Sequence, residues 1–206
     1  MILFIGDIHH SIEELERLIG AHPEAGVAVQ VGDLMPLPSP PASAKAAWRR
    51  MPIPLHFIDG NHHDYSVTRG LSAAAEVLPG LVYQPRGSVA DLDGRRLAFL
   101  GGAESTVDLE WRQRGRDYWP DHEAIRAEDV ARLLTNTNGR RVDFLVTHIA
   151  PASVMARHTS THSVSAGLVE QAWNELGRPP LVCGHLHTHY QGEGVEVLPY
   201  LGSILR

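Results

Sequence analysis

The segment ILFIGDIH (residues 2–9) is a short apolar run that ends in a compact polar motif. The same arrangement recurs in four later segments, VAVQVGD (27–33), PLHFIDGNH (54–62), VDFLVTH (142–148) and PLVCGHLH (180–187). Short, continuous apolar runs are typical of strands that are buried on both faces, as in parallel sheets. The spacing of the first three predicts strand–connection–strand units of the βαβ kind, and therefore an α/β fold.

Helical patterns fill several of the connections. In HSIEELERLIGAH (10–22), Ser11 suits the N-cap position and Glu14 lies three residues later, as in a capping box. One apolar face of this segment is formed by Ile12, Leu15, Leu18 and Ile19. We expect further helices at 42–50, 65–77, 121–135 and 165–176.

The remaining segments indicate turns and antiparallel strands. MPLPSPP (35–41) has too many prolines for regular structure and predicts a loop. GSVADLDGRRLAFLGG (87–102) consists of two alternating runs about an Asp-Gly turn, which predicts a hairpin. Short strands are expected near 195–198 and 201–205. Together these patterns predict a single α/β domain over residues 1–206, in which parallel units give way to antiparallel strands.

Composition narrows the classes of function. The chain has a net charge of -6 and a pI of about 6.1, which gives no electrostatic footprint for nucleic acid. The lone cysteine, Cys183, excludes an internal disulfide and suggests a reducing compartment, the cytoplasm. The first residues do not resemble a secretion signal, and no segment has the ~18–20 apolar residues that cross a membrane. We therefore expect no membrane partner.

Five polar motifs follow the apolar runs, and ligands of open α/β sheets bind beyond the carboxyl ends of strands. We therefore expect these side chains to converge. They are Asp7, His9, Asp33, Asn61, His62, His148, His185 and His187. Oxygen and imidazole ligands without thiolate suit Mn, Fe, Co, Ni or Zn. Each motif alone also has a structural explanation, such as a turn or a core histidine, but the ordered set favours a metal site.

The ordered pattern D-x-H, G-D, G-N-H, H and G-H-x-H resembles that of the calcineurin-like metallophosphoesterases. The segment RGRDYWPDHE (114–123) resembles a stretch of some of their small bacterial and phage-type members. The resemblance extends from Asp7 to His187. It implies a four-layer α/β/β/α sandwich with mixed sheets and a site at one rim. It also implies two divalent metal ions, with manganese favoured, and hydrolysis of a phosphomonoester or phosphodiester by direct attack of a metal-bridging hydroxide.

The family's roles transfer to matching positions of this chain. The resemblance implies that Asp7, His9 and His187 hold a first metal ion and that Asp33 bridges both ions. It assigns the second ion to Asn61, His148 and His185. His62 would face the substrate phosphate without binding metal, and would donate a hydrogen bond or a proton.

The chain departs from some relatives in ways that bear on substrate. The Asp-Arg-Gly run of the Ser/Thr protein phosphatase branch is missing after Gly32-Asp33, which argues against that branch. His63 stands where relatives often have an acid, with Asp64 one position later. We expect His63 to face solvent in a turn; the alternative is that His63 or Asp64 contacts substrate or the groups behind the metal ligands. Residues that could contact substrate are Arg114, Arg116, Trp119, His158 and His162. A phosphorylated small molecule is the expected substrate; a nuclease of the same chemistry and a non-catalytic scaffold remain alternatives.

Overall fold

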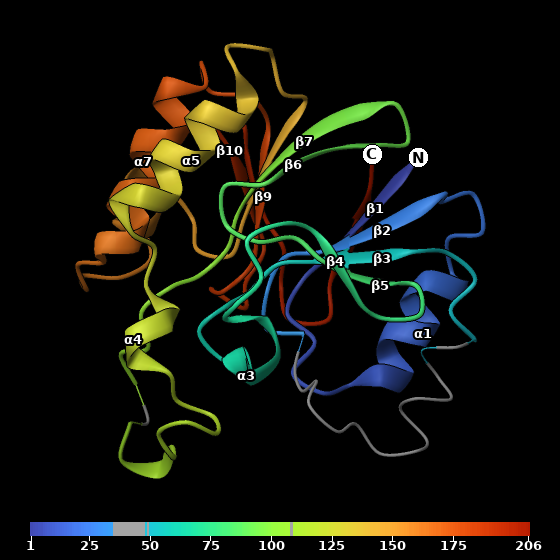
Figure 1. The fold of residues 1–206 in the computed structure, drawn as a ribbon, viewed down its shortest axis with the longest axis horizontal. Coiled ribbons are helices and arrows are strands. Elements are labelled where there is room, and N and C mark those ends of the chain that lie inside the picture. Colours follow the sequence, from blue (N-terminus) through green and yellow to red (C-terminus); the bar gives the residue numbers. More distant parts are fainter. Residues whose placement is uncertain (35–47, 49, 108) are drawn as a thin grey trace.

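Two six-stranded sheets form the centre of the molecule. The computed structural model describes residues 1–34, 48, 50–107 and 109–206. In this part of the chain the two sheets lie between flanking helices (Figure 1). The predicted loop at 35–41 and most of the predicted helix at 42–50 lie outside the described residues.

The first sheet has the strand order β12-β1-β2-β3-β5-β4. Its strands are β1 (Ile2–Ile5), β2 (Val27–Gln30), β3 (Leu55–Phe57), β4 (Ala75–Leu78), β5 (Leu81–Tyr83) and β12 (Ser203–Leu205). The central strands β1, β2, β3 and β5 are parallel, whereas β12 and β4 run antiparallel at the two edges.

The second sheet has the order β10-β11-β9-β8-β7-β6 and the same plan. Its strands are β6 (Val89–Leu92), β7 (Arg95–Leu100), β8 (Phe144–Thr147), β9 (Leu181–Cys183), β10 (Tyr190–Gly192) and β11 (Val195–Val197). Parallel strands again occupy the centre, and β10 and β6 form antiparallel edges. The predicted hairpin at 87–102 is β6 and β7, joined at Asp93-Gly94.

Helices cover the outer faces of both sheets. The helices among the described residues are α1 (Ile12–Gly20), α3 (Tyr65–Thr68), α4 (Pro120–Glu123), α5 (Ala127–Thr137), α6 (Ala152–Met155) and α7 (Val164–Glu175), with a 3₁₀ turn η1 (Leu109–Trp111). In Figure 1, α1 lies beside the first sheet, and α5 and α7 lie beside the second. No helix in the described ranges combines the length and the hydropathy that crossing a membrane requires.

Successive side chains of a strand point to opposite faces of its sheet, and this alternation explains how the two sheets and the helices pack. Phe4 and Val29 of the first sheet pack against Phe99 and Val146 of the second. The neighbouring residues on β1 point the other way, toward α1. Because most residues of the central strands are buried on both faces, their sequences are mainly apolar. The expected α/β sandwich with mixed sheets and flanking helices is confirmed.

The expected helix at 65–77 is wrong over most of its length. Only Tyr65–Thr68 is helical, and Ala75–Leu78 and Leu81–Tyr83 form the antiparallel strands β4 and β5. The Pro79-Gly80 pair lies in the turn between them. Turn residues between two short runs rich in β-branched and aromatic residues indicate a hairpin. Parallel hydrogen bonding of β5 to β3 then makes this hairpin part of the first sheet.

Two details of the helices also differ from expectation. Ser11 is the N-cap residue of α1, but its side chain makes no capping hydrogen bond, and Glu14 pairs with Arg17 instead. The expected helix at 121–135 is divided into α4 and α5 by extended backbone at Ala124 and Arg126. Asp129 caps the start of α5 by accepting a hydrogen bond from the Arg126 main-chain nitrogen at 3.0 Å.

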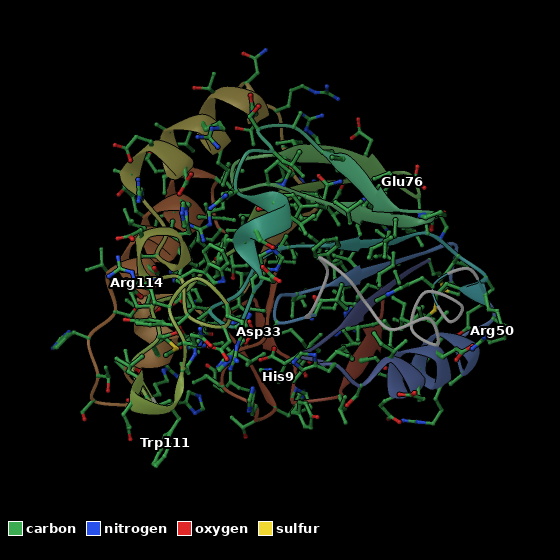
Figure 2. All side chains as sticks on the ribbon, turned by 60° about the horizontal axis from the view of Figure 1, so that its bottom comes forward. His9, Asp33, Arg50, Glu76, Trp111 and Arg114 are labelled. Carbon is green, nitrogen blue, oxygen red and sulfur yellow. The ribbon has the colours of Figure 1, made fainter. Side chains whose placement is uncertain are left out.

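The packing between the sheets predicts a large cost for Phe99→Ala. Phe99 is fully buried in this layer, so truncation leaves a cavity and should lower the free energy of unfolding by about 3–5 kcal/mol. Urea unfolding followed by circular dichroism measures the change. The matched control is Trp111→Ala, since Trp111 is 81% exposed and projects from the surface in Figure 2. We expect that control to change stability by less than about 0.5 kcal/mol; a similar loss in both variants would contradict the packing argument.

Candidate metal centre

The polar motifs lie where strands of both sheets end. Asp7 follows β1, Asp33 follows β2 and Asn61 follows β3, whereas His148 and His185 follow β8 and β9. Within each sheet these strands run parallel to one another, so their carboxyl ends lie at the same edge, and the contacts of His148 and His185 with Asp33 and Asn61 bring the two edges together at one rim. Figure 2 shows His9 and Asp33 close together at this rim.

The backbone around these residues turns sharply. His9, Asp33, His185 and His187 all have positive φ, between 42° and 68°. Non-glycine residues adopt this region rarely, and such strain concentrates at functional sites.

Glycine beside the polar residues leaves room for their neighbours. An added Cβ at Gly60 would overlap the carboxylate of Asp33, and one at Gly32 would overlap the ring of His148. The glycines of the Gly-Asn-His and Gly-Asp motifs therefore allow groups from different strands to approach closely.

One group of donor atoms surrounds Asp7. His187 Nε2 lies 3.0 Å from Asp7 Oδ2 and 3.1 Å from His9 Nε2. His9 Nε2 also lies 3.9 Å from Asp33 Oδ2. Ligand atoms of Asp7, His9 and His187 fall within 4.8 Å of one another, a spacing at which they could hold one metal ion.

A second group lies on the other side of Asp33. His148 Nε2 is 3.4 Å from Asp33 Oδ2 and 3.1 Å from Asn61 Oδ1. His185 Nδ1 approaches the same Asn61 oxygen at 3.1 Å. Asp7, Asp33 and His148 also lie within 4.8 Å of one another, so Asp7 belongs to both groups, and Asp33 reaches the first group through its contact with His9 at 3.9 Å.

The hydrogen bonds behind these atoms orient them. His148 Nδ1 lies 3.0 Å from the main-chain oxygen of Val31, which can only accept, so Nδ1 carries the hydrogen. Nε2 is then the atom that faces the oxygens of Asp33 and Asn61, where a proton or a metal cation would balance the charge of Asp33. Fixing the ring through its other nitrogen in this way is typical of metal-binding histidines.

Burial makes the electrostatics of the centre strong. Burial alone would raise the pKa of Asp33, but the neighbouring charge and hydrogen bond of His148 hold it below its usual value. Burial alone would lower the pKa of His148, and Asp33 instead raises it to about 9. Burial and the charge of His148 lower the pKa of His185 to about 4. Two buried carboxylates with four imidazole rings and an amide oxygen fit divalent cations of the borderline class.

His62 is placed beside the donor groups without joining them. Its main-chain nitrogen donates to Asp33 Oδ1 at 2.8 Å, and its ring lies edge-on to that of His9 at 5.1 Å. Burial lowers the pKa of His62, against the opposing effect of Asp33. The residue also lines a cavity of about 350 Å³ that opens onto Asp33, Asn61 and His185.

Several other expected contacts differ from the structure. His63 is only 1% exposed, so the expectation that it faces solvent is wrong: Nε2 lies 2.7 Å from Thr68 Oγ1 and its ring stacks on Tyr83. The described lining of the cavity does not include the other candidates for substrate contact, which are Arg114, Arg116, Trp119, His158 and His162.

Sequence reasoning missed Arg112. Its guanidinium donates to the main-chain oxygen of Asn61 at 2.8 Å and also contacts Ser105, Asp117 and Glu123. The side chain is almost fully buried, so it fixes the turn that carries Asn61. No local motif marks this role, because the partner lies 51 positions away in the sequence.

The fold and the donor groups define an α/β sandwich protein with a candidate metal centre of carboxylate, amide and imidazole ligands at the rim of its two sheets. The family model for calcineurin-like phosphoesterases matches residues 1–189. The chain therefore belongs to the calcineurin-like phosphoesterase family, whose membership implies metal-dependent hydrolysis of phosphoesters. A comparison with curated proteins finds none that matches the sequence significantly.

The shared position of Asp33 predicts a difference between two substitutions. Asp33→Asn should lower metal affinity by more than about a hundredfold, since even groups that only orient ligands contribute ten- to a hundredfold. His62→Ala should retain metal, because its ring is outside both donor groups. Elemental analysis after equilibration with manganese measures the bound metal, and its full loss in His62→Ala would contradict this assignment.

Arg112→Met tests the support of the Asn61 turn. Loss of the guanidinium should lower the affinity for manganese by about tenfold, as for other groups behind a ligand. Arg114→Met is the control, because Arg114 is exposed and pairs only with Asp121 among the described residues. Titration calorimetry measures both affinities; equal values for the two variants would show that Arg112 does not position Asn61.

Proposed function

We propose that the protein is a dinuclear-metal phosphoesterase that hydrolyses a phosphomonoester or phosphodiester of a small molecule. The observation that carries this proposal is the position of Asp33 between two groups of donor atoms. In the proposal, Asp7, His9 and His187 complete the first site, and Asn61, His148 and His185 complete the second. Manganese is the favoured metal, with Fe, Zn, Ni and Co as alternatives.

The chain's own residues supply binding and proton transfer. Bound ions would neutralise phosphoryl charge and make water nucleophilic near neutral pH. Asn61 contributes a neutral oxygen, so the centre keeps positive charge for an anionic substrate. The His62 ring, held beside the cavity, would donate a hydrogen bond to the phosphoryl group or a proton to the departing ester oxygen. Water supplies the new oxygen on phosphorus, and the P–O bond to the leaving group breaks.

Three features support a small substrate and a reducing compartment. The cavity volume falls within the range of ~300–1,000 Å³ that small-molecule sites occupy. The net charge of -6 argues against a polyanionic nucleic acid. Cys183 is a buried free thiol, in keeping with the proposed cytoplasmic location.

A panel of aryl esters tests the proposed activity. We expect the protein loaded with Mn, Fe, Co, Ni or Zn to hydrolyse 4-nitrophenyl phosphate, bis(4-nitrophenyl) phosphate or both. His62→Ala should lower kcat by about 10²–10⁴-fold, the usual contribution of a positioned acid or base. His158→Ala, an exposed histidine, is the matched control and should keep full activity. If the metal-loaded protein hydrolyses neither ester, the scaffold alternative replaces the enzyme; cleavage of DNA or RNA in preference to both would favour the nuclease.

A further inference from the structure

The cavity beside the metal centre has a second wall whose chemistry differs from that of the centre. Its hydroxyl groups come from Thr106, Thr159, Thr161 and Ser163, and Ile149 and Met155 add apolar surface. Lysine and arginine are not found among the described lining residues, and the charged side chain on this wall is the acid Glu104.

Glu104 is close to the centre and fixed in place. The next residue, Ser105, donates through Oγ to the main-chain oxygen of Asn61 at 3.3 Å. The Glu104 carboxylate accepts hydrogen bonds from Ser163 Oγ at 2.6 Å and from the Ser165 main-chain nitrogen at 2.8 Å. Both donors belong to the start of α7, where the helix dipole favours a negative charge.

These contacts keep Glu104 ionised while leaving it able to bind substrate. Partial burial tends to raise its pKa, but the hydrogen bonds from Ser163 and Ser165 lower it below the usual value. A carboxylate has about four acceptor positions, and these two bonds occupy only part of them. A fixed anion with free acceptor positions therefore lines the cavity beside the expected phosphoryl position.

We propose that Glu104 selects substrates whose leaving group carries a hydrogen-bond donor, a hydroxyl or an ammonium, and no second anionic group. This inference rests on the proposed phosphoesterase function of the same site. A donor group gains a charge-assisted hydrogen bond to the carboxylate. A second phosphate or carboxylate meets a like charge instead, which disfavours nucleoside polyphosphates and phosphorylated acids.

Matched aryl esters test the selection directly. The substrates are phosphate esters of phenols, prepared as monoesters or diesters according to which class the enzyme hydrolyses. Each phenol carries a hydroxymethyl, an aminomethyl or a carboxylate group in the meta or para position. The wild type should prefer the first two substituents over the carboxylate in kcat/KM. Glu104→Gln should reduce this preference by about fivefold, the effect of one charge at moderate separation near a surface. The intrinsic reactivity of each leaving group is the same in every variant, so it cancels when the ratios of kcat/KM are compared between variants.

Two further variants distinguish the loss of a negative charge in the cavity from the loss of a carboxylate elsewhere in the protein. Glu104→Asp keeps the charge and should keep the discrimination. Glu170→Gln removes a carboxylate on α7 that accepts from the Oγ and main-chain nitrogen of Ser153 but does not line the cavity. It should leave the ratios unchanged. Equal ratios in the wild type and Glu104→Gln, or a wild type that prefers the carboxylate ester, would overturn the proposal.

Binding of benzylphosphonates with the same substituents distinguishes failure of this inference from failure of the proposed function. These compounds are not hydrolysed, and titration calorimetry on the manganese-loaded protein measures their Kd. The same preference and the same fivefold loss in Glu104→Gln are expected. If the preference is present without turnover of any ester, the proposed activity fails and the selection by Glu104 stands. A larger effect of Glu104→Gln on the aminomethyl compound than on the hydroxymethyl compound would identify ammonium as the favoured group.

Discussion

The buried carboxylate of Asp33 is the constraint around which the rim of the two sheets is organised. It is 1% exposed, and an isolated carboxylate in such a position is strongly unfavourable. One oxygen accepts from the His62 main-chain nitrogen, whereas the other faces His148 and His9. A negative charge is therefore tolerated only because donors and positive charge converge on it from several elements. The same convergence is what a pair of cations needs.

The architecture brings these elements together through buried main-chain contacts. Gln30, at the end of β2, donates to the main-chain oxygens of Gly6 and Gly32 and accepts from the Gly32 nitrogen at 3.0 Å. It thus joins the turns that carry Asp7 and Asp33. The centre is assembled by hydrogen bonds that belong to the fold, so its geometry is set before any ligand binds. This preorganisation lets fixed dipoles and charges act without a cost of reorganisation.

Most of the sheet and the donor groups could be predicted from the sequence because their signals are local. The strands that precede the polar motifs are mainly apolar, and each motif follows its strand closely. The errors lie where distant residues decide the outcome. The strands β4 and β5 are short, and pairing with β3 makes them sheet. His63 lies in a polar segment, yet Tyr65 and Tyr83 enclose its ring. Arg112 acts on a residue far away in the sequence.

A buried hydrogen-bond network lies on the far side of the Gly-Asn-His turn. Asp59 accepts from Arg86 Nε at 2.7 Å, Tyr83 Oη at 2.9 Å and Tyr65 Oη at 3.0 Å. Tyr65 Oη also contacts the main-chain oxygen of Gly60. This buried network holds the residues just before Asn61, and Arg112 holds the oxygen of Asn61 itself.

The turn is thus fixed from both sides by groups that do not join the donor clusters. A paired and hydrogen-bonded charge such as Asp59 with Arg86 is costly to break, because removing one partner leaves the other buried and uncompensated. Rotation of the turn would disrupt this pair, so Asn61 keeps its orientation toward His148 and His185, and His62 keeps its main-chain contact with Asp33. The Gly-Asn-His motif provides the candidate metal ligand and the candidate proton donor, and the buried Asp59–Arg86 ion pair behind it holds them in position.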